Sequence, residues 1–317
     1  MKKIYYFTQF SDQVLDGGSS RDAAFLACIK QIDESNLSII SLDSFGIKNK
    51  IFSLFKCIYL FLTIKNSAVL LHQNFIFSIF SGKLLNIRIY RSVVFFMLNI
   101  LANNNRLIVE INDLRFEQAI DFGIQFDRAG YLGVQKKIFQ LKNAEFIFAS
   151  SGLRNLSISH YGVSPGVTYT IINGGILRGG DDLSYESCST WISKDALNCV
   201  YAGGLIQGRQ IFEMVELFKE MPAVNLLLMG GDGDWLKEYP LPNNIKLVGN
   251  LPEALAHQLV EKCDLGLIPY DDTLSYYNLC YPTKASFYAT AGTPFLCTCL
   301  DELMETFKGD EFAIFLP

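Results

Sequence analysis

Asp264-Leu-Gly-Leu-Ile-Pro269, followed by Tyr277-Asn-Leu-Cys-Tyr-Pro-Thr-Lys-Ala-Ser-Phe-Tyr288, is the part of the chain that decides the fold. The first part predicts an apolar strand that stops at a proline. The second predicts a polar loop and then a helix with Pro282 in its first turn, where the missing N–H of proline is tolerated. A helix start presents unbonded backbone N–H groups to an anion, and a cation there adds to its partial charge. Lys284 falls in that turn, together with the hydroxyls of Thr283 and Ser286. The stretch therefore indicates either an ordinary strand–loop–helix unit of an α/β domain or a phosphate site.

Strand and helix patterns alternate along the whole chain, which predicts parallel α/β construction. The expected strands cover residues 3–7, 37–42, 68–72, 107–111, 146–149, 167–172, 199–202, 225–229 and 245–248. The expected helices cover residues 20–31, 50–62, 89–102, 133–141, 210–220 and 253–261. The run 174–193 is rich in glycine, serine and acidic residues, which is typical of a linker. We expect an N-terminal domain over 1–175, a linker over 176–195 and a C-terminal domain over 196–317, with any ligand at the carboxyl ends of the strands.

Composition restricts the class of protein. The chain has 317 residues, half of them apolar, which suits two globular domains and excludes a disordered class. No apolar run is long enough to span a membrane and the start is not a signal peptide, so we expect a cytoplasmic protein. The eight cysteines include no Cys-x-x-Cys pair and the three histidines have no ligand spacing. We therefore expect reduced thiols and no metal site.

Charge is distributed unevenly along the chain. The net charge is −5, yet residues 44–109 contain no Asp or Glu. That segment carries Lys48, Lys50, Lys56, Lys65, Lys83, Arg88, Arg91 and Arg106, interleaved with apolar helical stretches. Such a pattern favours attachment to an anionic membrane surface, and the alternative is two core helices with basic exposed positions. Nucleic acid is not expected as a partner, because the chain is acidic overall and lacks an aromatic–basic recognition motif.

Three segments carry a resemblance to a known family. The order Pro-Thr-Lys-x-Ser-x-Tyr from Pro282 to Tyr288, continued by Ala-Gly-x-Pro over 291–294, resembles the donor-binding segment of GT-B glycosyltransferases. It is most similar to a bacterial subgroup of galactofuranosyl- and glucosyltransferases with a Lys-x-Ser-x-Tyr pattern. Val-Tyr-Ala-Gly-Gly-Leu over 200–205 resembles the strand that opens the nucleotide domain, and Ile-Ile-Asn-Gly-Gly over 171–175 resembles the loop that ends the acceptor domain. The resemblance implies a GT-B fold, that is, two Rossmann-like domains facing across a cleft.

The resemblance also implies donor-site residues. The wider superfamily clamps the diphosphate with Gly-Arg and Lys-Gly pairs after the first strand, where this chain has Gly203-Gly204 and Gln207-Gly208. Arg209 and Lys284 would then carry more of the contact with the diphosphate. Phe287 stands near the place of the glutamate that often holds the ribose. The expected donor-binding residues are Gly204, Arg209, Gly249, Tyr281, Pro282, Thr283, Lys284, Ser286 and Tyr288.

Polar residues also follow the strands of the N-terminal half. Glu110, Asn112, Asp113 and Arg115 come at and just past the end of one strand, where catalytic groups gather in open α/β sheets. This segment resembles the acceptor-domain motif that usually carries His-Asp, with Asn112 in place of the histidine. Asparagine cannot move a proton, so Asp113, Glu110 and His72 are the candidate catalytic residues, and Asn112 and Arg115 are expected to bind substrate. His72, at the end of another strand, is equally compatible with a structural role.

A glycine pair stands near the start of the chain. Gly17 and Gly18 are expected in the turn between the first strand and a helix opened by Ser19, Ser20 and Asp22. Glycines there let backbone approach a ligand closely, although a plain βα turn is equally compatible. In the related enzymes this loop faces the sugar and the diphosphate. The pair does not form the Gly-x-Gly-x-x-Gly dinucleotide fingerprint, which argues against hydride transfer.

The resemblance implies transfer of a hexose from UDP to a saccharide hydroxyl, without a metal or cofactor beyond the nucleotide sugar. The implied setting is the assembly of a bacterial surface polysaccharide, such as O-antigen or capsule, with a lipid-linked acceptor at the inner face of the cell membrane. Two other functions stay open: a UDP-sugar epimerase of the same fold, and a non-catalytic sugar-nucleotide-binding partner of a transferase.

The end of the chain carries a further expectation. Glu302-Leu303 and Gly309-Asp-Glu-Phe-Ala-Ile-Phe-Leu-Pro317 resemble the stretch that closes the donor-domain sheet in related enzymes. A helical section normally follows it and crosses back to the first domain. We expect an apolar surface to be left uncovered here, in a chain shortened at its C-terminus or covered by a second copy or a partner chain.

Overall fold

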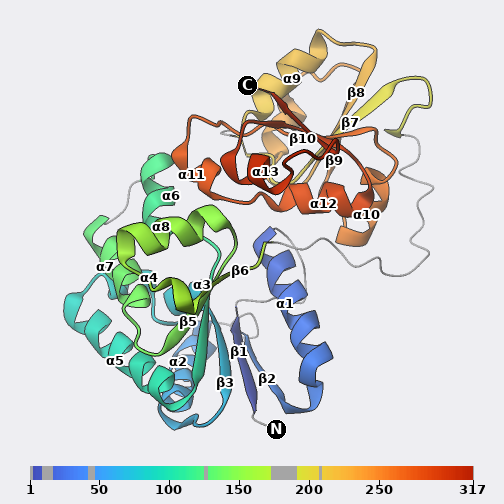
Figure 1. Cartoon of the computed structure of the whole chain (residues 1–317). Coiled ribbons are helices and arrows are strands. Elements are labelled where there is room, and N and C mark those ends of the chain that lie inside the picture. The colour runs from blue at the N-terminus through green and yellow to red at the C-terminus, as the bar shows by residue number, and fades with distance from the viewer. Residues whose placement is uncertain are drawn as a thin grey trace. The chain divides into compact units, whose positions relative to one another are not determined.

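The computed structural model describes residues 3–8, 17–41, 47–124, 128–172, 191–206 and 209–316. The chain divides into two compact units, unit 1 over Met1–Ile172 and unit 2 over Asn173–Pro317. Each unit is built on a six-stranded sheet whose strand pairs are all parallel (Figure 1). The α/β class predicted from the sequence is therefore confirmed. Most of the expected linker, 176–195, lies outside the described residues.

Unit 1 orders its strands β2-β1-β3-β4-β5-β6. The strands are β1 (Ile4–Thr8), β2 (Leu37–Ser41), β3 (Ala68–His72), β4 (Arg106–Ile111), β5 (Ala144–Phe148) and β6 (Thr168–Thr170). The helices are α1 (Gly17–Asp33), α2 (Ile47–Thr63), α3 (Gln73–Ile79), α4 (Gly82–Leu85), α5 (Arg88–Asn104), α6 (Arg115–Asp121), α7 (Arg128–Phe139) and α8 (Ser151–Tyr161), with short 3-10 turns at Glu34–Asn36 and Pro165–Val167. Helix α1 lies on one face of the sheet, and α2, α5 and α7 lie on the other (Figure 1).

The core of unit 1 follows from strand alternation, because successive side chains point to opposite faces of a sheet. Tyr6 of β1 packs in the layer beneath α1, with Leu26 and Ile29 of that helix. The next residue, Phe7, points to the other face, where its ring meets Phe61 at 5.2 Å in an edge-on arrangement. Tyr6 and Phe7 are both fully buried, which fixes the register of this strand between its two helix layers.

Unit 2 orders its strands β12-β11-β10-β7-β8-β9. The strands are β7 (Leu197–Ala202), β8 (Val224–Met229), β9 (Ile245–Gly249), β10 (Leu265–Ile268), β11 (Phe295–Thr298) and β12 (Ala313–Leu316). The helices are α9 (Ile211–Lys219), α10 (Glu253–Val260), α11 (Ser275–Leu279), α12 (Thr283–Ala291) and α13 (Asp301–Thr306), with a 3-10 turn at Asp234–Glu238. In β7, Cys199 and Tyr201 pack toward α9, while Val200 and Ala202 pack toward α10 and α12.

Three expectations about the elements are corrected. Helix α1 begins at Gly17, so Gly17 and Gly18 form its first turn and not the turn before it. Helix α12 begins at Thr283, with Pro282 as the residue just before it. The loop before Pro282 contains the short helix α11, which the sequence pattern did not predict.

Two further observations concern membrane contact and the end of the chain. Among the described residues, no helix has both the length and the apolar character needed to cross a bilayer. Strand β12 leaves Ile314 and Leu316 each 47% exposed.

Candidate functional sites

Each sheet has one point at which its strand order reverses. In unit 1 the reversal lies between β1 and β3, and in unit 2 between β7 and β10. Connections leave these neighbouring strands toward opposite sides of the sheet, which opens a crevice at their carboxyl ends where ligands bind in α/β proteins. Most of the polar residues singled out in the sequence fall at these two points.

In unit 2, the loops after β7 and β8 are joined backbone to backbone. Gly203 N donates to Met229 O, and Leu205 N donates to Gly231 O, both at 2.8 Å. Gly230 has φ +145°, and a Cβ atom there would lie 2.0 Å from Gly203 O. Only glycine fits such a conformation and approach. The loop that carries Gly204 is therefore held against its neighbour by glycine contacts.

Lys284 reaches this loop from the first turn of α12. Its Nζ donates to Tyr270 Oη at 2.9 Å. The same ammonium lies 4.9 Å from the ring centre of Tyr201 and 5.0 Å from that of Tyr270. A Cβ atom on Gly203 would lie 2.6 Å from Lys284 Nζ, so the glycine leaves the space that the lysine occupies. The Lys284 side chain is thus fixed over the end of β7, with only 6% of the residue exposed.

Arg209 brings a second cation to the same place. Its guanidinium carbon lies 5.9 Å from the Tyr270 ring centre. Among the described residues, neither Arg209 nor Lys284 has a carboxylate within ion-pair distance. Burial alone would raise the pKa of Tyr270, but these two cations outweigh burial and hold it below the ordinary value of 10.0. Asp232 Oδ2 and Arg209 Nη1 each lie 3.7 Å from the place that a Cβ atom on Gly204 would take, so one carboxylate is near this site without pairing at ion-pair distance with either cation.

The other residues of the Lys-x-Ser-x-Tyr segment lie in the core. Tyr288 is fully buried, and its hydroxyl donates to Leu267 O at 3.1 Å and accepts from Ala202 N at 3.0 Å, which ties β10 to β7. A Cβ atom on Gly266 would lie 2.6 Å from the Tyr288 ring, so that glycine makes room for it. Ser286 Oγ lies 2.9 Å from Tyr281 Oη, and burial raises the pKa of Tyr281. In the structure Tyr281, Ser286 and Tyr288 therefore hold helix α12, which carries Lys284, against the sheet.

Gly249 lies at the end of β9. It has φ +78°, a conformation that favours glycine, and its carbonyl accepts from Gly230 N at 2.8 Å. The structure thus connects the loops after β7, β8 and β9 in one row at the carboxyl edge of the sheet.

In unit 1, buried ionic groups gather at the reversal point. Glu110 at the end of β4 has no exposed surface, and its Oε1 lies 2.6 Å from Arg21 Nε. Arg21, in α1, also donates from one terminal nitrogen to Ile171 O at 2.6 Å. Asn112 Oδ1 accepts from Arg21 Nε at 3.0 Å. The Arg21–Glu110 ion pair thus fastens α1 to the end of β4.

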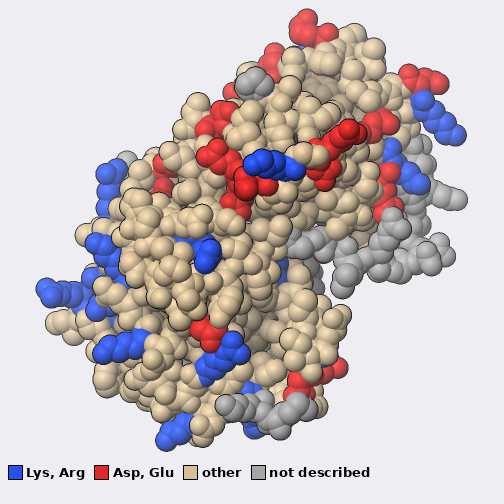
Figure 2. Space-filling model, viewed as in Figure 1, with Lys and Arg blue, Asp and Glu red and all other residues tan. Residues whose placement is uncertain are grey.

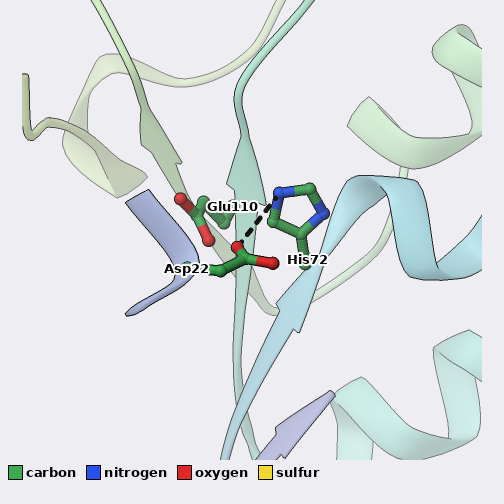
Figure 3. Close-up of side chains that lie close together, drawn as sticks. All are labelled: Asp22, His72 and Glu110. Carbon is green, nitrogen blue, oxygen red and sulfur yellow. Dashed lines mark ion pairs between the residues drawn. The ribbon is translucent and has the colours of Figure 1, made fainter. Parts of the chain in front are cut away.

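His72 and Asp22 form a second buried pair beside the first (Figure 3). His72 Nε2 lies 3.5 Å from Asp22 Oδ1 and 2.8 Å from the side-chain amide nitrogen of Asn112. Its Nδ1 accepts from Asn74 N at 3.0 Å at the start of α3. Asp22 is held from the other side by Thr8 Oγ1, which donates at 2.7 Å. His72 is therefore locked between a helix start and a carboxylate.

Asp22, His72 and Glu110 could be considered as metal ligands, since one ligand atom from each lies within 4.8 Å of the others. Their surroundings favour an ion-pair network. Glu110 is already neutralised by the Arg21 cation. Both ring nitrogens of His72 already have polar protein neighbours, because Nδ1 accepts from Asn74 N and Nε2 lies 2.8 Å from the Asn112 amide nitrogen and 3.5 Å from Asp22 Oδ1.

The remaining sequence-predicted residues of unit 1 lie at the rim of this network. Asp113 and Asn112 are half-buried just past β4, so Asp113 is more accessible than Glu110 or His72. Arg115 donates to Asn74 Oδ1 at 2.6 Å and stacks over Phe77, 4.4 Å from its ring centre. The first turn of α1, at Gly17 and Gly18, leaves backbone N–H groups without partners inside the helix.

Sequence reasoning missed four residues of these sites. Arg21 and Tyr270 were not singled out, Asp22 was read only as part of a helix start, and Tyr201 only as part of a strand. Arg21-Asp22 is a charged pair on a helix that must pack on an apolar sheet, and such a pair has to be compensated when buried. That signal was present in the sequence, although it could not say that the partners are Glu110 and His72, about 90 and 50 residues away.

Comparisons with known proteins show the fold. No protein-family model matches the chain, and no curated protein does. Among solved structures, sucrose-phosphate synthase from Thermosynechococcus elongatus superimposes with a TM-score of 0.68 at 14% identity, over 100% of this chain and 86% of that one. WaaG, a glycosyltransferase involved in lipopolysaccharide biosynthesis, gives 0.64 at 9% identity, over 99% and 85%. HepE of Anabaena, in complex with UDP-glucose, gives 0.63 at 15% identity, over 100% and 85%. The fold of this chain is that of the GT-B glycosyltransferases, as the sequence predicted.

Proposed function

We propose that this protein is a glycosyltransferase that moves a hexose from UDP to a hydroxyl of a saccharide acceptor. One observation carries the proposal: Lys284 and Arg209 meet at the reversal point of unit 2 without a carboxylate partner among the described residues. Two cations held in this way, next to the first turn of α12, form a site for a diphosphate. The likeness to HepE in complex with UDP-glucose supports a UDP-sugar as the ligand.

The chemistry follows from the charge that develops during transfer. The diphosphate gains negative charge as the glycosidic bond breaks, and fixed cations and N–H groups that face it stabilise the transition state. Lys284, Arg209 and the N-terminus of α12 supply these groups. They deliver the positive charge that a divalent metal supplies in other transferases, so we expect activity to survive EDTA.

Unit 1 would bind the acceptor. Asp113 is the accessible carboxylate at the end of β4 and would accept the hydroxyl proton. Glu110 and His72 do not contact the acceptor in this proposal; they position Asp113 indirectly, because their pairs with Arg21 and Asp22 fix the shape of this edge of the sheet. WaaG is involved in lipopolysaccharide biosynthesis, which supports a lipid-linked acceptor and a role in bacterial surface polysaccharide assembly at the inner face of the membrane.

The test follows the release of UDP from a panel of UDP-hexoses, with oligosaccharides and lipid-linked saccharides as acceptors. We expect acceptor-dependent release. Asp113→Asn should lower turnover and leave UDP affinity unchanged, whereas Lys284→Met should lower both. A second free sugar nucleotide formed from a UDP-sugar alone would identify an epimerase. Tight UDP binding without turnover under any of these conditions would identify a non-catalytic binding protein.

A further inference from the structure

Helices α2 and α5 of unit 1 expose an apolar face. Both helices cover the same side of the sheet and pack against each other (Figure 1). Their inward residues, such as Cys57 and Phe61 of α2 and Leu98 of α5, are buried. Their outward residues are also apolar and 53–79% exposed; these are Phe52, Phe55 and Tyr59 of α2 and Ile89, Val93 and Phe96 of α5, which we call the α2–α5 face.

The spacing shows that the exposed apolar residues form one stripe on each of these two helices. Phe52, Phe55 and Tyr59 follow at intervals of three and four residues, as do Ile89, Val93 and Phe96, so each set forms one stripe along its helix. A helix on the surface of a water-soluble protein normally turns charged and polar residues to that side. These two helices are apolar on the outside as well as the inside, which marks an interaction surface.

The segment that carries the α2–α5 face has charges of one sign only. Residues 44–109, which include both helices, contain no Asp or Glu. Lys56 of α2 and Arg88 of α5 are exposed. Arg88 lines a shallow hollow of about 370 Å³ together with Ile89, Ser92, Val93 and Phe96, so that a guanidinium lies beside the apolar stripe. Figure 2 shows that Lys and Arg gather on the side of unit 1 where α5 lies.

We propose that the α2–α5 face docks on an anionic lipid bilayer. Aromatic and aliphatic side chains that project between basic residues are the composition of a segment lying in a membrane interface. In this arrangement the rings of Phe52, Phe55 and Phe96 enter the boundary between headgroups and acyl chains. Lys56 and Arg88 then meet the phosphates of the headgroups. Docking involves no residue of the proposed transfer chemistry, so membrane binding can be tested independently of the proposed function.

A second copy of the chain is a poorer occupant of the same face. A two-fold dimer would bring this surface against itself and place basic residues against basic residues. Like charges brought together across an interface oppose association. An anionic bilayer complements both features of the face, its apolar stripes and its positive charge.

The test is flotation of the full chain with vesicles of phosphatidylcholine alone and of phosphatidylcholine with phosphatidylglycerol. We expect binding to the anionic vesicles that falls as salt rises, and little binding to the neutral ones. Phe52→Ser, Phe55→Ser and Phe96→Ser combined should weaken binding at least tenfold. Lys56→Gln with Arg88→Gln should weaken it on the order of tenfold. All five side chains are exposed, so we expect the fold and the UDP affinity of these variants to be unchanged.

The matched control lies on α9 of unit 2. Phe212 and Leu217 are 40% and 58% exposed, but acidic Glu213 and Glu216 share that helix. Phe212→Ser with Leu217→Ser should leave flotation unchanged. Equal flotation of the wild type and the triple Phe variant would overturn the proposal, as would absence of binding to anionic vesicles. A dimer in sedimentation velocity that the triple variant disperses, without lipid binding, would assign the face to a second copy.

Discussion

The two reversal points differ in how their charges are balanced. In unit 1 the buried Arg21 pairs with Glu110, and Asp22 lies against His72. In unit 2, Lys284 and Arg209 have aromatic and hydroxyl neighbours, and among the described residues neither has a carboxylate within ion-pair distance, although Asp232 lies near Arg209. In the first arrangement each charged group faces one of opposite sign, although Glu110 Oε2 is buried without a hydrogen-bond partner among the described residues; the second arrangement is the basis of the proposed diphosphate site. A paired cluster is the basis for assigning a fixed framework to unit 1, and two cations without an ion-pair partner among the described residues are the basis for the binding site proposed in unit 2.

Net charge alone would have given the opposite assignment. Unit 1 contains 18 Lys and Arg against 12 Asp and Glu, whereas unit 2 contains 9 against 20. The proposed diphosphate site nevertheless lies in the acidic unit. Local arrangement is decisive here, because charges in the protein interior interact strongly at low dielectric constant, whereas distant surface charges are screened by water and salt.

The largest expected effect is on the framework of unit 1. Glu110→Gln keeps the shape of the side chain but leaves Arg21 buried without its counter-ion, which should lower the free energy of unfolding by about 3–5 kcal/mol. Chemical denaturation measures the change. Glu145→Gln is the control, because Arg106 and Glu145 form a pair at 2.7 Å in which Arg106 is 65% exposed. Exposed pairs contribute about 0–1 kcal/mol, so equal losses in the two variants would contradict a structural role for Glu110.

An intermediate effect is expected beneath the unit 2 site. Tyr288→Phe removes the hydroxyl that joins Ala202 N to Leu267 O and leaves a buried amide without its partner. The free energy of unfolding should fall by about 1–3 kcal/mol. Tyr59→Phe, at a side chain that is 65% exposed, should change stability little. If the two variants were equally stable, Tyr288 would be free for a direct role in binding.

A smaller effect should be visible in the titration of Tyr270. Its pKa is lowered because Lys284 and Arg209 outweigh the effect of burial, so its ultraviolet tyrosinate signal should appear below the ordinary value of 10.0. Tyr270→Phe should remove that early signal. Lys284→Met should raise the pKa, and so should bound UDP, because its phosphates neutralise the same cations. A titration that UDP leaves unchanged would place the diphosphate elsewhere.

Much of the fold was predictable from the sequence, because the strands are apolar runs between turn residues. The expected strand 68–72 coincides with β3 (Ala68–His72), and the expected strands at 199–202 and 225–229 fall inside β7 and β8. Helix α8 was missed because Ser151–Tyr161 is mostly polar and buries little beyond Leu153 and Ser157. Its boundaries were nevertheless marked by the Ser150 cap and by Gly162 in the left-handed conformation.

The sites were predictable in part. Lys284, Arg209, Glu110 and His72 follow strands or open helices, and the topology places such positions at one edge of a sheet. The pairing was not predictable, because the partners of Arg21 and Asp22 come from β4 and β3 and depend on the order of the strands. Tyr288 has the composition of a site residue but a buried position, which only the packing against Gly266 shows.

The most direct measurement is the affinity of the full chain for UDP by calorimetry at neutral pH, in the wild type, in Lys284→Met and in Lys246→Met. Lys246, an exposed residue of β9, is the matched control. We predict that the wild type binds UDP more tightly than uridine. Lys284→Met should lose about 1.5–3 kcal/mol of the binding free energy of UDP and little of that of uridine, while Lys246→Met binds as the wild type does. Equal UDP affinity in all three proteins would show that Lys284 does not contribute to the diphosphate site and would contradict the account.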